Sequence, residues 1–165
     1  MAGLEADFEQ FVTARSPALL RTAYLLTGNH QDAEDLVQAA LVKAVPAWGR
    51  VREHEPYVRR ILVHESVSRW RRRRWRETST ESLPELGVGA VDVDTRLALR
   101  QALGRLAPRQ RAVIVLRYFE DLTEAQTADV LQISVGTVKS QSRDALARLR
   151  ALVPDLDADA MASEP

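Results

Sequence analysis

The chain has 165 residues, of which 45% are hydrophobic, with no cysteine and with 23 basic and 23 acidic side chains that give a formal net charge of zero. This length fits one ordinary domain or two very small ones. The lack of cysteine excludes disulfides, thiolate zinc sites and a thiol redox switch, and favours a reducing cytoplasm. No stretch approaches the roughly 20 apolar residues that cross a bilayer or resembles a signal peptide, so we expect no membrane insertion and no export.

The neutral total hides blocks of opposite charge. Residues 1–49 carry 3 basic and 6 acidic groups, whereas residues 50–76 carry 10 and 3. Residues 77–95 carry 0 and 5, and the remainder carries 10 and 9. Because the local field rather than the total charge attracts a charged partner, these blocks predict different surfaces for different partners.

Apolar residues recur at helical spacing in nearly every long segment, and no segment alternates convincingly with period two, which predicts an all-α protein. The first helical region passes Phe8 and Tyr24 and is expected to end at Gly28 and Asn29. Asn29 is the expected cap of a second helix with an acidic first turn. The expected apolar stripe of that helix consists of Leu36, Val37, Ala40, Leu41, Ala44 and Val45.

A third helix is expected to have Pro56 in its first turn and to run through Tyr57 and Ile61 toward Trp75. The helical pattern then breaks between residues 77 and 94, where Pro, Gly and five carboxylates occur without a basic residue. This composition predicts a flexible acidic linker.

Helical spacing resumes after the linker. Pro108 is expected to open a helix whose apolar face holds Val113, Leu116 and Phe119, and two shorter helices follow. Asp and Ala dominate the last residues, which predicts a frayed acidic tail. We therefore expect two small helical domains at residues 5–76 and 95–152, with the linker at 77–94 and the tail at 153–165.

The most specific local pattern lies between residues 123 and 150. Thr123 and Gln126 have the spacing of a capping box, and Ser134 can cap another helix after a three-residue turn, which predicts a helix-turn-helix. Two packed helices of an ordinary bundle are the alternative. One face of the second helix is expected to be inward, with Val138, Ser142, Ala145, Leu146 and Leu149. The other face carries Thr137, Lys139, Ser140, Arg143 and Asp144. The members of this set near the helix start have donors suited to phosphates and base edges in a major groove.

The second predicted helix, "DAEDLVQAALVKA", places Asp32, Asp35 and Gln38 near one face while its apolar residues turn toward the core. A solvated acidic start at the positive end of the helix dipole explains this face as well as a protein contact does.

Residues 55–77 are basic and aromatic together. Tyr57, Trp70 and Trp75 offer planar faces on which unpaired bases can stack, and core packing of these rings is the alternative. Several arginines can neutralise phosphates or form a solvated helix end, namely Arg59, Arg60, Arg69, Arg71, Arg72, Arg73, Arg74 and Arg76.

The segment "LRYFEDLTEAQTADVLQISVGTVKSQSRDALARLR", above all "SVGTVKSQ" at residues 134–141, closely resembles the part of extracytoplasmic-function sigma factors that binds the promoter minus-thirty-five element. "ALGRLAPRQRAVIVLRYFEDL" is similar to the helix pair that precedes it in this family of RNA polymerase subunits. "DAEDLVQAALVKA" resembles the sigma segment that docks on the polymerase β′ clamp, and residues 55–77 resemble the segment at the minus-ten element. The resemblances cover about 130 of the 165 residues in the family's order.

This resemblance implies a sigma factor that binds core RNA polymerase through its β′ clamp and β flap, recognises both promoter elements and promotes strand separation, without a cofactor, a metal or catalysis. Many members are held inactive by an anti-sigma protein, which is therefore a further partner to test. The implied polymerase contacts are Asp32, Glu34, Asp35 and Gln38. The implied minus-ten contacts are Tyr57, Arg60, His64, Arg69, Trp70, Arg71, Arg72, Arg73 and Arg74. The implied minus-thirty-five contacts are Thr137, Lys139, Ser140, Gln141 and Arg143.

Three residues depart from the family pattern. Gln132 stands in a turn where many members have Gly, which costs roughly 1 kcal/mol if that position needs a positive φ. Asp144 replaces a basic residue of many relatives, and His64 replaces a frequent Asn. In the family the linker crosses positively charged polymerase channels, so its carboxylates are expected to mimic nucleic acid, with a plain disordered spacer as the alternative. These carboxylates belong to Glu77, Glu81, Glu85, Asp92 and Asp94.

Two other classes of protein compete with a sigma factor. An ordinary helix-turn-helix regulator that binds duplex DNA as a dimer explains the second domain, but leaves the Arg and Trp cluster and the acidic helix as coincidences. An enzyme has little support, because the only histidines are His30, His54 and His64, and there is no cysteine, no Gly-rich phosphate loop and no nucleophile elbow.

Overall fold

The computed structural model describes the backbone of residues 2–74 and 93–154, and the side chains of residues 2–70 and 97–154. Every regular element within these ranges is a helix, which confirms the all-α prediction. The chain divides into two compact units, Met1–Arg76 and Glu77–Pro165. The predicted linker lies outside the described residues, except that Val93 and Asp94 already belong to a helix.

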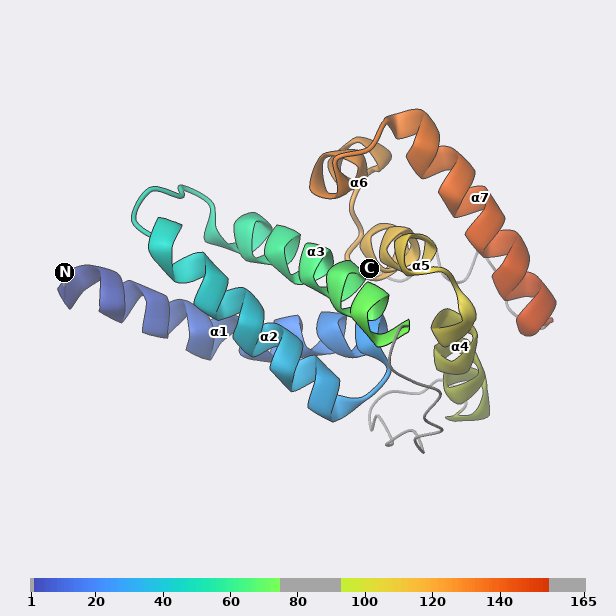
Figure 1. Cartoon of the computed structure of the whole chain (residues 1–165), viewed down its shortest axis with the longest axis horizontal. Coiled ribbons are helices and arrows are strands. Elements are labelled where there is room, and N and C mark those ends of the chain that lie inside the picture. Colours follow the sequence, from blue (N-terminus) through green and yellow to red (C-terminus); the bar gives the residue numbers. More distant parts are fainter. Residues whose placement is uncertain (1, 75–92, 155–165) are drawn as a thin grey trace. The chain divides into compact units, whose positions relative to one another are not determined.

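The first unit contains α1 (Ala2–Thr27), α2 (His30–Ala44), the short 3-10 helix η1 (Val45–Ala47) and α3 (His54–Arg74), shown in Figure 1. The predicted end of α1 is confirmed, since Gly28 has a φ of +88° and its N–H donates to the Tyr24 carbonyl at 2.8 Å. Asn29 caps α2 by accepting from the Asp32 N–H at 2.8 Å, as predicted. The turn between α1 and α2 is thus specified by two adjacent residues.

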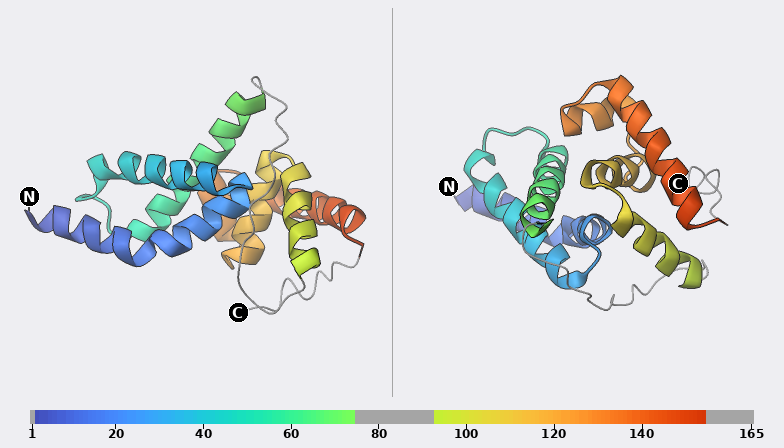
Figure 2. Two further views of the ribbon diagram at one scale, coloured as in Figure 1. Left: turned by 90° about the horizontal axis from the view of Figure 1, so that it is seen from below. Right: turned by 45° about the vertical axis from the view of Figure 1, so that its right-hand side comes forward.

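The core of the first unit forms where α2 packs against both α1 and α3. Leu36 and Ala40 of α2 are fully buried, and so are Val58 and Leu62 of α3. Burial of this apolar stripe drives the three helices together. Figure 2 also shows that α1 is bent, which fits Pro17 inside the helix, because proline lacks the N–H that would bond one turn back.

The predicted apolar stripe of α2 is wrong at one residue. Val45 is 52% exposed, whereas Ala44 beside it is fully buried. Helical spacing explains this exposure, because Val45 lies nine positions after the buried Leu36 and therefore about 180° around the helix axis from it.

The second unit contains α4 (Val93–Arg105), α5 (Pro108–Ile114), the π-helical turn η2 (Val115–Phe119), α6 (Glu124–Leu131) and α7 (Val135–Leu152). Pro108 opens α5 as predicted, and Val113 and Leu116 are fully buried. Phe119 was expected on the same apolar face, but it is 41% exposed. The wider π turn changes the rotation per residue and moves Phe119 away from that face. The expectation of two short helices also fails for α7, which has 18 residues.

Arg111 joins α4 to α5 from inside the second unit. Its guanidinium donates to the Leu103 carbonyl at 2.8 Å and to the Gly104 carbonyl at 3.0 Å, at the C-terminal end of α4. Burial lowers the pKa of Arg111 to about 10, so the group is still charged at neutral pH. A buried cation thereby satisfies carbonyls that a helix end leaves without partners.

The helix-turn-helix is confirmed at α6 and α7. Thr123 and Gln126 form the predicted capping box, with hydrogen bonds of 3.0 and 2.9 Å, and Ser134 caps α7 by accepting from the Thr137 N–H at 3.0 Å. Gln132 has a φ of +55°, the left-handed conformation that its place in the turn led us to suspect. The shared core of this motif consists of Val113, Ala128 and Val138, with Leu131 and Ile133 packed against them.

Replacing Gln132 with Gly should raise the free energy of unfolding of the second unit by about 0.5–1 kcal/mol, because glycine has no Cβ to strain at positive φ. The matched control is Gln141→Gly inside α7, which should lower the free energy of unfolding by roughly 1 kcal/mol. Hydrogen exchange of the α6 and α7 amides in the full chain measures both changes. Destabilisation by Gln132→Gly would show that the turn is not strained.

Candidate nucleic-acid and protein interfaces

One face of α2 is acidic. Glu34, Asp35 and Gln38 are exposed along it, on the side opposite the buried Leu36. Gln31 supports this face by donating from its side-chain amide to Asp35 at 3.2 Å. The structure therefore brings three of the four predicted polymerase contacts onto one solvent-facing stripe of a helix.

Asp32, the fourth predicted polymerase contact, differs from the other three. It is only half-buried, and its carboxylate accepts a 2.6 Å hydrogen bond from the Asn29 side chain. Its backbone N–H is the one that Asn29 caps. Asp32 thus helps to build the start of α2, so that a change there affects the helix as well as its surface.

The exposed stripe of α2 continues into apolar residues. Val42 is 68% exposed one turn beyond Gln38, and Val45 follows three residues later. The sequence analysis assigned Val45 to the core and gave Val42 no role. Val42 lies four positions after Gln38 and Val45 lies seven, and this helical spacing places both on the same side of the helix as Gln38.

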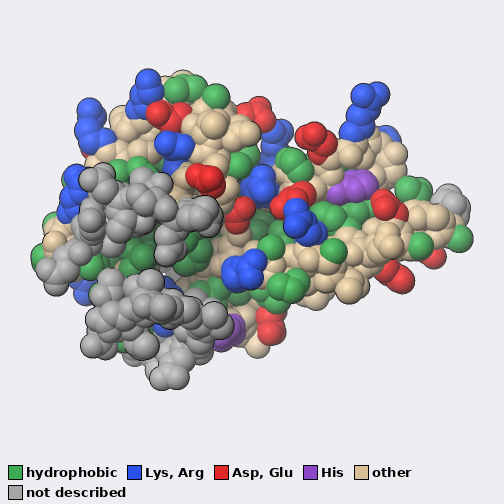
Figure 3. Space-filling model, turned by 180° about the vertical axis from the view of Figure 1, so that it is seen from behind, with side chains coloured by type: hydrophobic (Ala, Val, Ile, Leu, Met, Phe, Trp, Pro, Cys, Tyr) green, Lys and Arg blue, Asp and Glu red, His purple; other side chains and the backbone are tan. Residues whose placement is uncertain are grey.

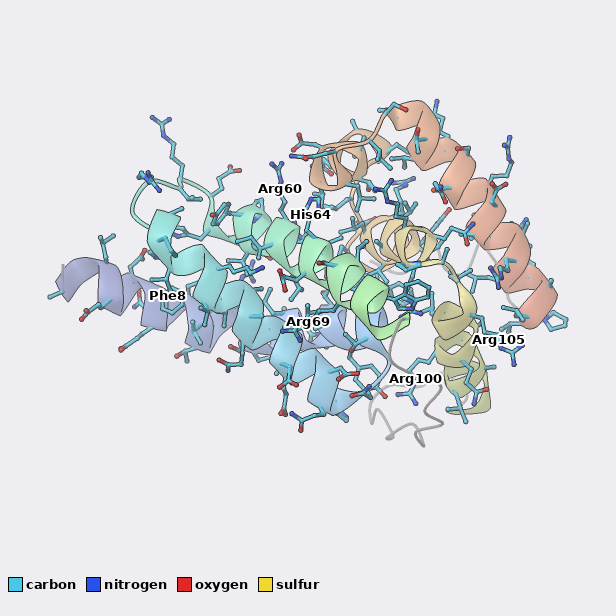
Figure 4. All side chains as sticks on the ribbon, in the orientation of Figure 1. Phe8, Arg60, His64, Arg69, Arg100 and Arg105 are labelled. Carbon is cyan, nitrogen blue, oxygen red and sulfur yellow. The ribbon has the colours of Figure 1, made fainter. Side chains whose placement is uncertain are left out.

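α3 presents Tyr57, Arg60 and His64 on one side, since these residues are three and four positions apart. Figure 4 shows Arg60 and His64 projecting from the same side of the ribbon, with Arg69 on another side. Tyr57 and Arg60 are half-buried and His64 is exposed. Three of the predicted minus-ten contacts therefore form a shared surface.

Arg69 lies apart from that surface because it belongs to an ion-pair network with α2. Its guanidinium is 3.6 Å from the buried carboxylate of Glu65, which also pairs with Lys43 of α2. Trp70 is half-buried. The backbone of α3 is described as far as Arg74, but the side chains of its last four residues are not. These four residues are the remaining predicted minus-ten contacts, Arg71, Arg72, Arg73 and Arg74.

Two further basic residues occupy the turn between α2 and α3. Arg50 and Arg52 are both exposed there, immediately before α3 begins at His54. The sequence reasoning counted them in the basic block but gave them no role. The sequence feature that could have identified them is a pair of arginines two positions apart in a short connection between two predicted helices.

α7 separates its two faces cleanly. Val138, Ala145 and Leu149 are fully buried, whereas Lys139 and Arg143 are exposed one turn apart. Both of these cations are therefore available to the same ligand. Of the other residues predicted to contact DNA on this helix, three are half-buried, namely Thr137, Ser140 and Gln141.

The polar residues at the start of α7 are partly used within the helix. The Thr137 and Ser134 hydroxyls are 2.8 Å apart, and the Ser140 hydroxyl donates to the Thr137 carbonyl at 3.1 Å. Asp144 lies 3.9 Å from the Arg143 guanidinium, with 80% of the Arg143 side chain exposed. Because exposed ion pairs contribute little, Arg143 can exchange Asp144 for a phosphate or a base edge.

Charge is dispersed elsewhere on the surface. On the face that Figure 3 shows, Lys and Arg side chains stand among acidic and hydrophobic ones instead of forming one patch. Within residues 2–70 and 97–154 there is no cluster of three His, Cys, Asp or Glu that could hold a metal ion. Nor does any helix in the described ranges have the length and hydropathy to span a membrane.

Comparison with known proteins matches both units to families. Residues 11–76 match the family "Sigma-70 region 2", and residues 102–151 match "Sigma-70, region 4". An RNA polymerase sigma-E factor of Streptomyces avermitilis is 40% identical, over 96% of this chain and 91% of that protein. The ECF RNA polymerase sigma factor SigM of Mycobacterium tuberculosis is 31% identical, over 93% of this chain and 80% of that protein.

Solved structures agree with the sequence relatives. The sigma factor RpoE in complex with the anti-sigma factor NepR, from Bartonella quintana, has a TM-score of 0.76 and 26% identity, covering 92% of this chain and 99% of that one. CnrH in complex with the cytosolic domain of CnrY has a TM-score of 0.65 and 26% identity, covering 93% and 91%. Because the identity extends over nearly the whole length and both matched regions occur in the family's order, this chain belongs to the extracytoplasmic-function group of RNA polymerase sigma factors, which direct the polymerase to promoters at the start of transcription.

Proposed function

We propose that the two units of this sigma factor divide the work of promoter recognition between residues 5–76, which bind core polymerase and the minus-ten element, and residues 95–152, which bind the minus-thirty-five element. The observation that carries this proposal is the α7 surface, where Lys139 and Arg143 stand one turn apart above a fully buried apolar face.

α7 has the form of a recognition helix for duplex DNA. Ser134 caps the start of the helix, and the first turn lies at the surface. The buried Val138 packs in the core of the motif and thereby fixes the rotation of the helix. Arginine and lysine on the exposed side suit guanine edges and phosphates in a major groove. We assign this groove contact to Thr137, Lys139, Ser140, Gln141 and Arg143.

α3 supplies the surface for separated strands. Tyr57 is half-buried and lies three positions before Arg60, so helical spacing places an aromatic ring and a cation on the side of α3 that also exposes His64. Base stacking on an aromatic ring contributes ~1–3 kcal/mol per base, which offsets the loss of base pairing when no ATP is used. We assign minus-ten binding to these three residues and Trp70, with additional phosphate contacts from Arg69 and from Arg71 to Arg74.

The acidic face of α2 is our proposed contact with the β′ clamp of core polymerase, through basic groups on the clamp. Glu34, Asp35 and Gln38 are exposed on a helix whose opposite side is buried, so the two carboxylates and the Gln38 amide are presented without rearrangement. We propose that the second unit meets the β flap of core polymerase.

We further propose that the chain has no catalytic activity or cofactor and works in the cytoplasm, where its polymerase partner is. Two of its three histidines have packing roles, since His30 packs on Tyr24 and His54 stacks on Trp48. An anti-sigma protein is our proposed third partner, since the solved structure of the sigma factor RpoE contains the anti-sigma factor NepR.

Charge reversal of the acidic face tests the polymerase contact. Glu34→Lys with Asp35→Lys should weaken binding to core RNA polymerase roughly tenfold or more, because like charges would then face the clamp. Asp32 is left intact because it helps to cap α2. Glu5→Lys with Glu9→Lys on the exposed side of α1 is the matched control, with the same change in charge. Equal binding by both double variants would remove α2 from the interface, and circular dichroism checks that helicity is kept.

Arg143→Ala tests sequence reading by α7. Reconstituted holoenzyme should lose roughly 1–3 kcal/mol in open-complex formation on a promoter with an intact minus-thirty-five element, as expected for a base-directed arginine. On a template with those bases scrambled, the same change should matter little. Arg148→Ala, which removes another exposed arginine of α7, is the control. An equal loss on both templates would assign Arg143 to backbone affinity or folding.

A further inference from the structure

α7 carries one carboxylate among its cations. The helix contains four basic residues and a single acidic one, Asp144, whose side chain is 64% exposed. Asp144 lies four positions after Ser140 and seven after Thr137, and this spacing places the three residues on one side of the helix. The carboxylate therefore lies within the surface that we assign to the minus-thirty-five element.

The ion pair of Asp144 is too weak to explain a carboxylate at this place. Its carboxylate is 3.9 Å from the Arg143 guanidinium, and both side chains are mostly exposed. Adjacent residues of a helix do not face each other, and exposed ion pairs contribute little to stability. Replacing Asp144 with alanine, which is the better helix former, should therefore leave α7 folded.

A carboxylate on a DNA-facing helix is selective in what it can bind. Phosphate oxygens repel it, so it lowers affinity for DNA of any sequence unless it accepts a hydrogen bond. In the major groove the hydrogen-bond donors are the amino groups of cytosine and adenine. Adenine also presents its N7 acceptor beside the amino group, whereas cytosine presents the amino group alone. Cytosine is therefore the base that suits a carboxylate.

The neighbouring Arg143 has the opposite preference. Its guanidinium only donates, and guanine presents two acceptors, O6 and N7, in the major groove. Arg143 and Asp144 thus place a donor and an acceptor next to each other at the surface of α7. This pattern complements G·C base pairs, in which guanine accepts and cytosine donates.

We propose that Asp144 is a specificity-determining residue of α7, which accepts a hydrogen bond from the N4 amino group of a cytosine in the minus-thirty-five element. The inference rests on the function proposed above for α7, and it adds a base contact of opposite polarity to those of the cations. A carboxylate that only orients Arg143, or that only repels phosphate, would give different results in the following experiment.

The experiment uses holoenzyme reconstituted with core RNA polymerase and a promoter that this holoenzyme transcribes. A set of fragments carries each of the four bases at each position of the minus-thirty-five element, and open-complex formation is measured on all of them. The unchanged chain should prefer cytosine at one position by roughly tenfold, the size of one hydrogen bond to a charged group. Asp144→Ala should lose the preference at that position and keep the preferences at the others.

Asp144→Asn is the sharper variant, because it keeps the shape of the side chain and removes its charge. An asparagine side chain pairs with N6 and N7 of adenine, so the preferred base at this position should change from cytosine to adenine. Asp129→Asn removes an exposed carboxylate from α6 of the same motif and is the matched control. It should alter no base preference.

The other outcomes contradict the inference, each in a different way. A uniform rise in binding to all fragments with Asp144→Ala would reduce the carboxylate to phosphate repulsion. Loss of preference only at the position that Arg143→Ala also abolishes, with no change to adenine in Asp144→Asn, would show that Asp144 acts through Arg143. If the unchanged chain has no preference at any minus-thirty-five position, the function proposed for α7 fails as well, whereas preferences that Asp144→Ala leaves intact contradict the inference alone.

Discussion

The surfaces of this sigma factor depend on burial of one stripe of each short helix. A helix of this length gains most of its stability from packing an apolar face, so the buried stripe fixes which side chains point outward. In α7 the fully buried Val138 and Leu149 place Lys139 and Arg143 on the surface, and in α2 the buried Leu36 does the same for Asp35. Loss of the buried stripe would therefore remove the binding surface together with the fold.

Signals that act within one turn of helix were predictable from the sequence. The caps at Asn29, Thr123 and Ser134 use partners three residues away, so spacing alone finds them. Hydrophobic periodicity likewise identified the helices and most of their inward residues. It failed at Phe119, because the π turn there changes the rotation per residue and a pattern that assumes α-helical spacing cannot anticipate this. Val45 was assigned to the wrong face, because α-helical spacing itself places it with the exposed Gln38.

Contacts that depend on packing between helices were not predictable. The role of Arg111 requires knowing that α5 brings it beneath the end of α4, and Arg69 is drawn aside by a Glu65 carboxylate that also meets α2. The Trp48 indole N–H donates to the Asp7 carboxylate of α1 at 3.1 Å, and because these residues are 41 positions apart in sequence, no local pattern connects them. Sequence reasoning thus found the outward faces of α2, α3 and α7 but not the buried polar contacts that hold these helices in position.

Together the two units give one chain a helix with an acidic face, an aromatic and basic helix, and a helix-turn-helix, a combination that a simple duplex-binding regulator does not need. The most direct measurement is run-off transcription from a promoter-containing duplex with purified core RNA polymerase. Our account predicts a discrete transcript only when the chain is present, and its loss when the minus-ten and minus-thirty-five bases are scrambled. Transcription that is unaffected by the chain, or binding to the duplex without core polymerase and without initiation, would contradict it.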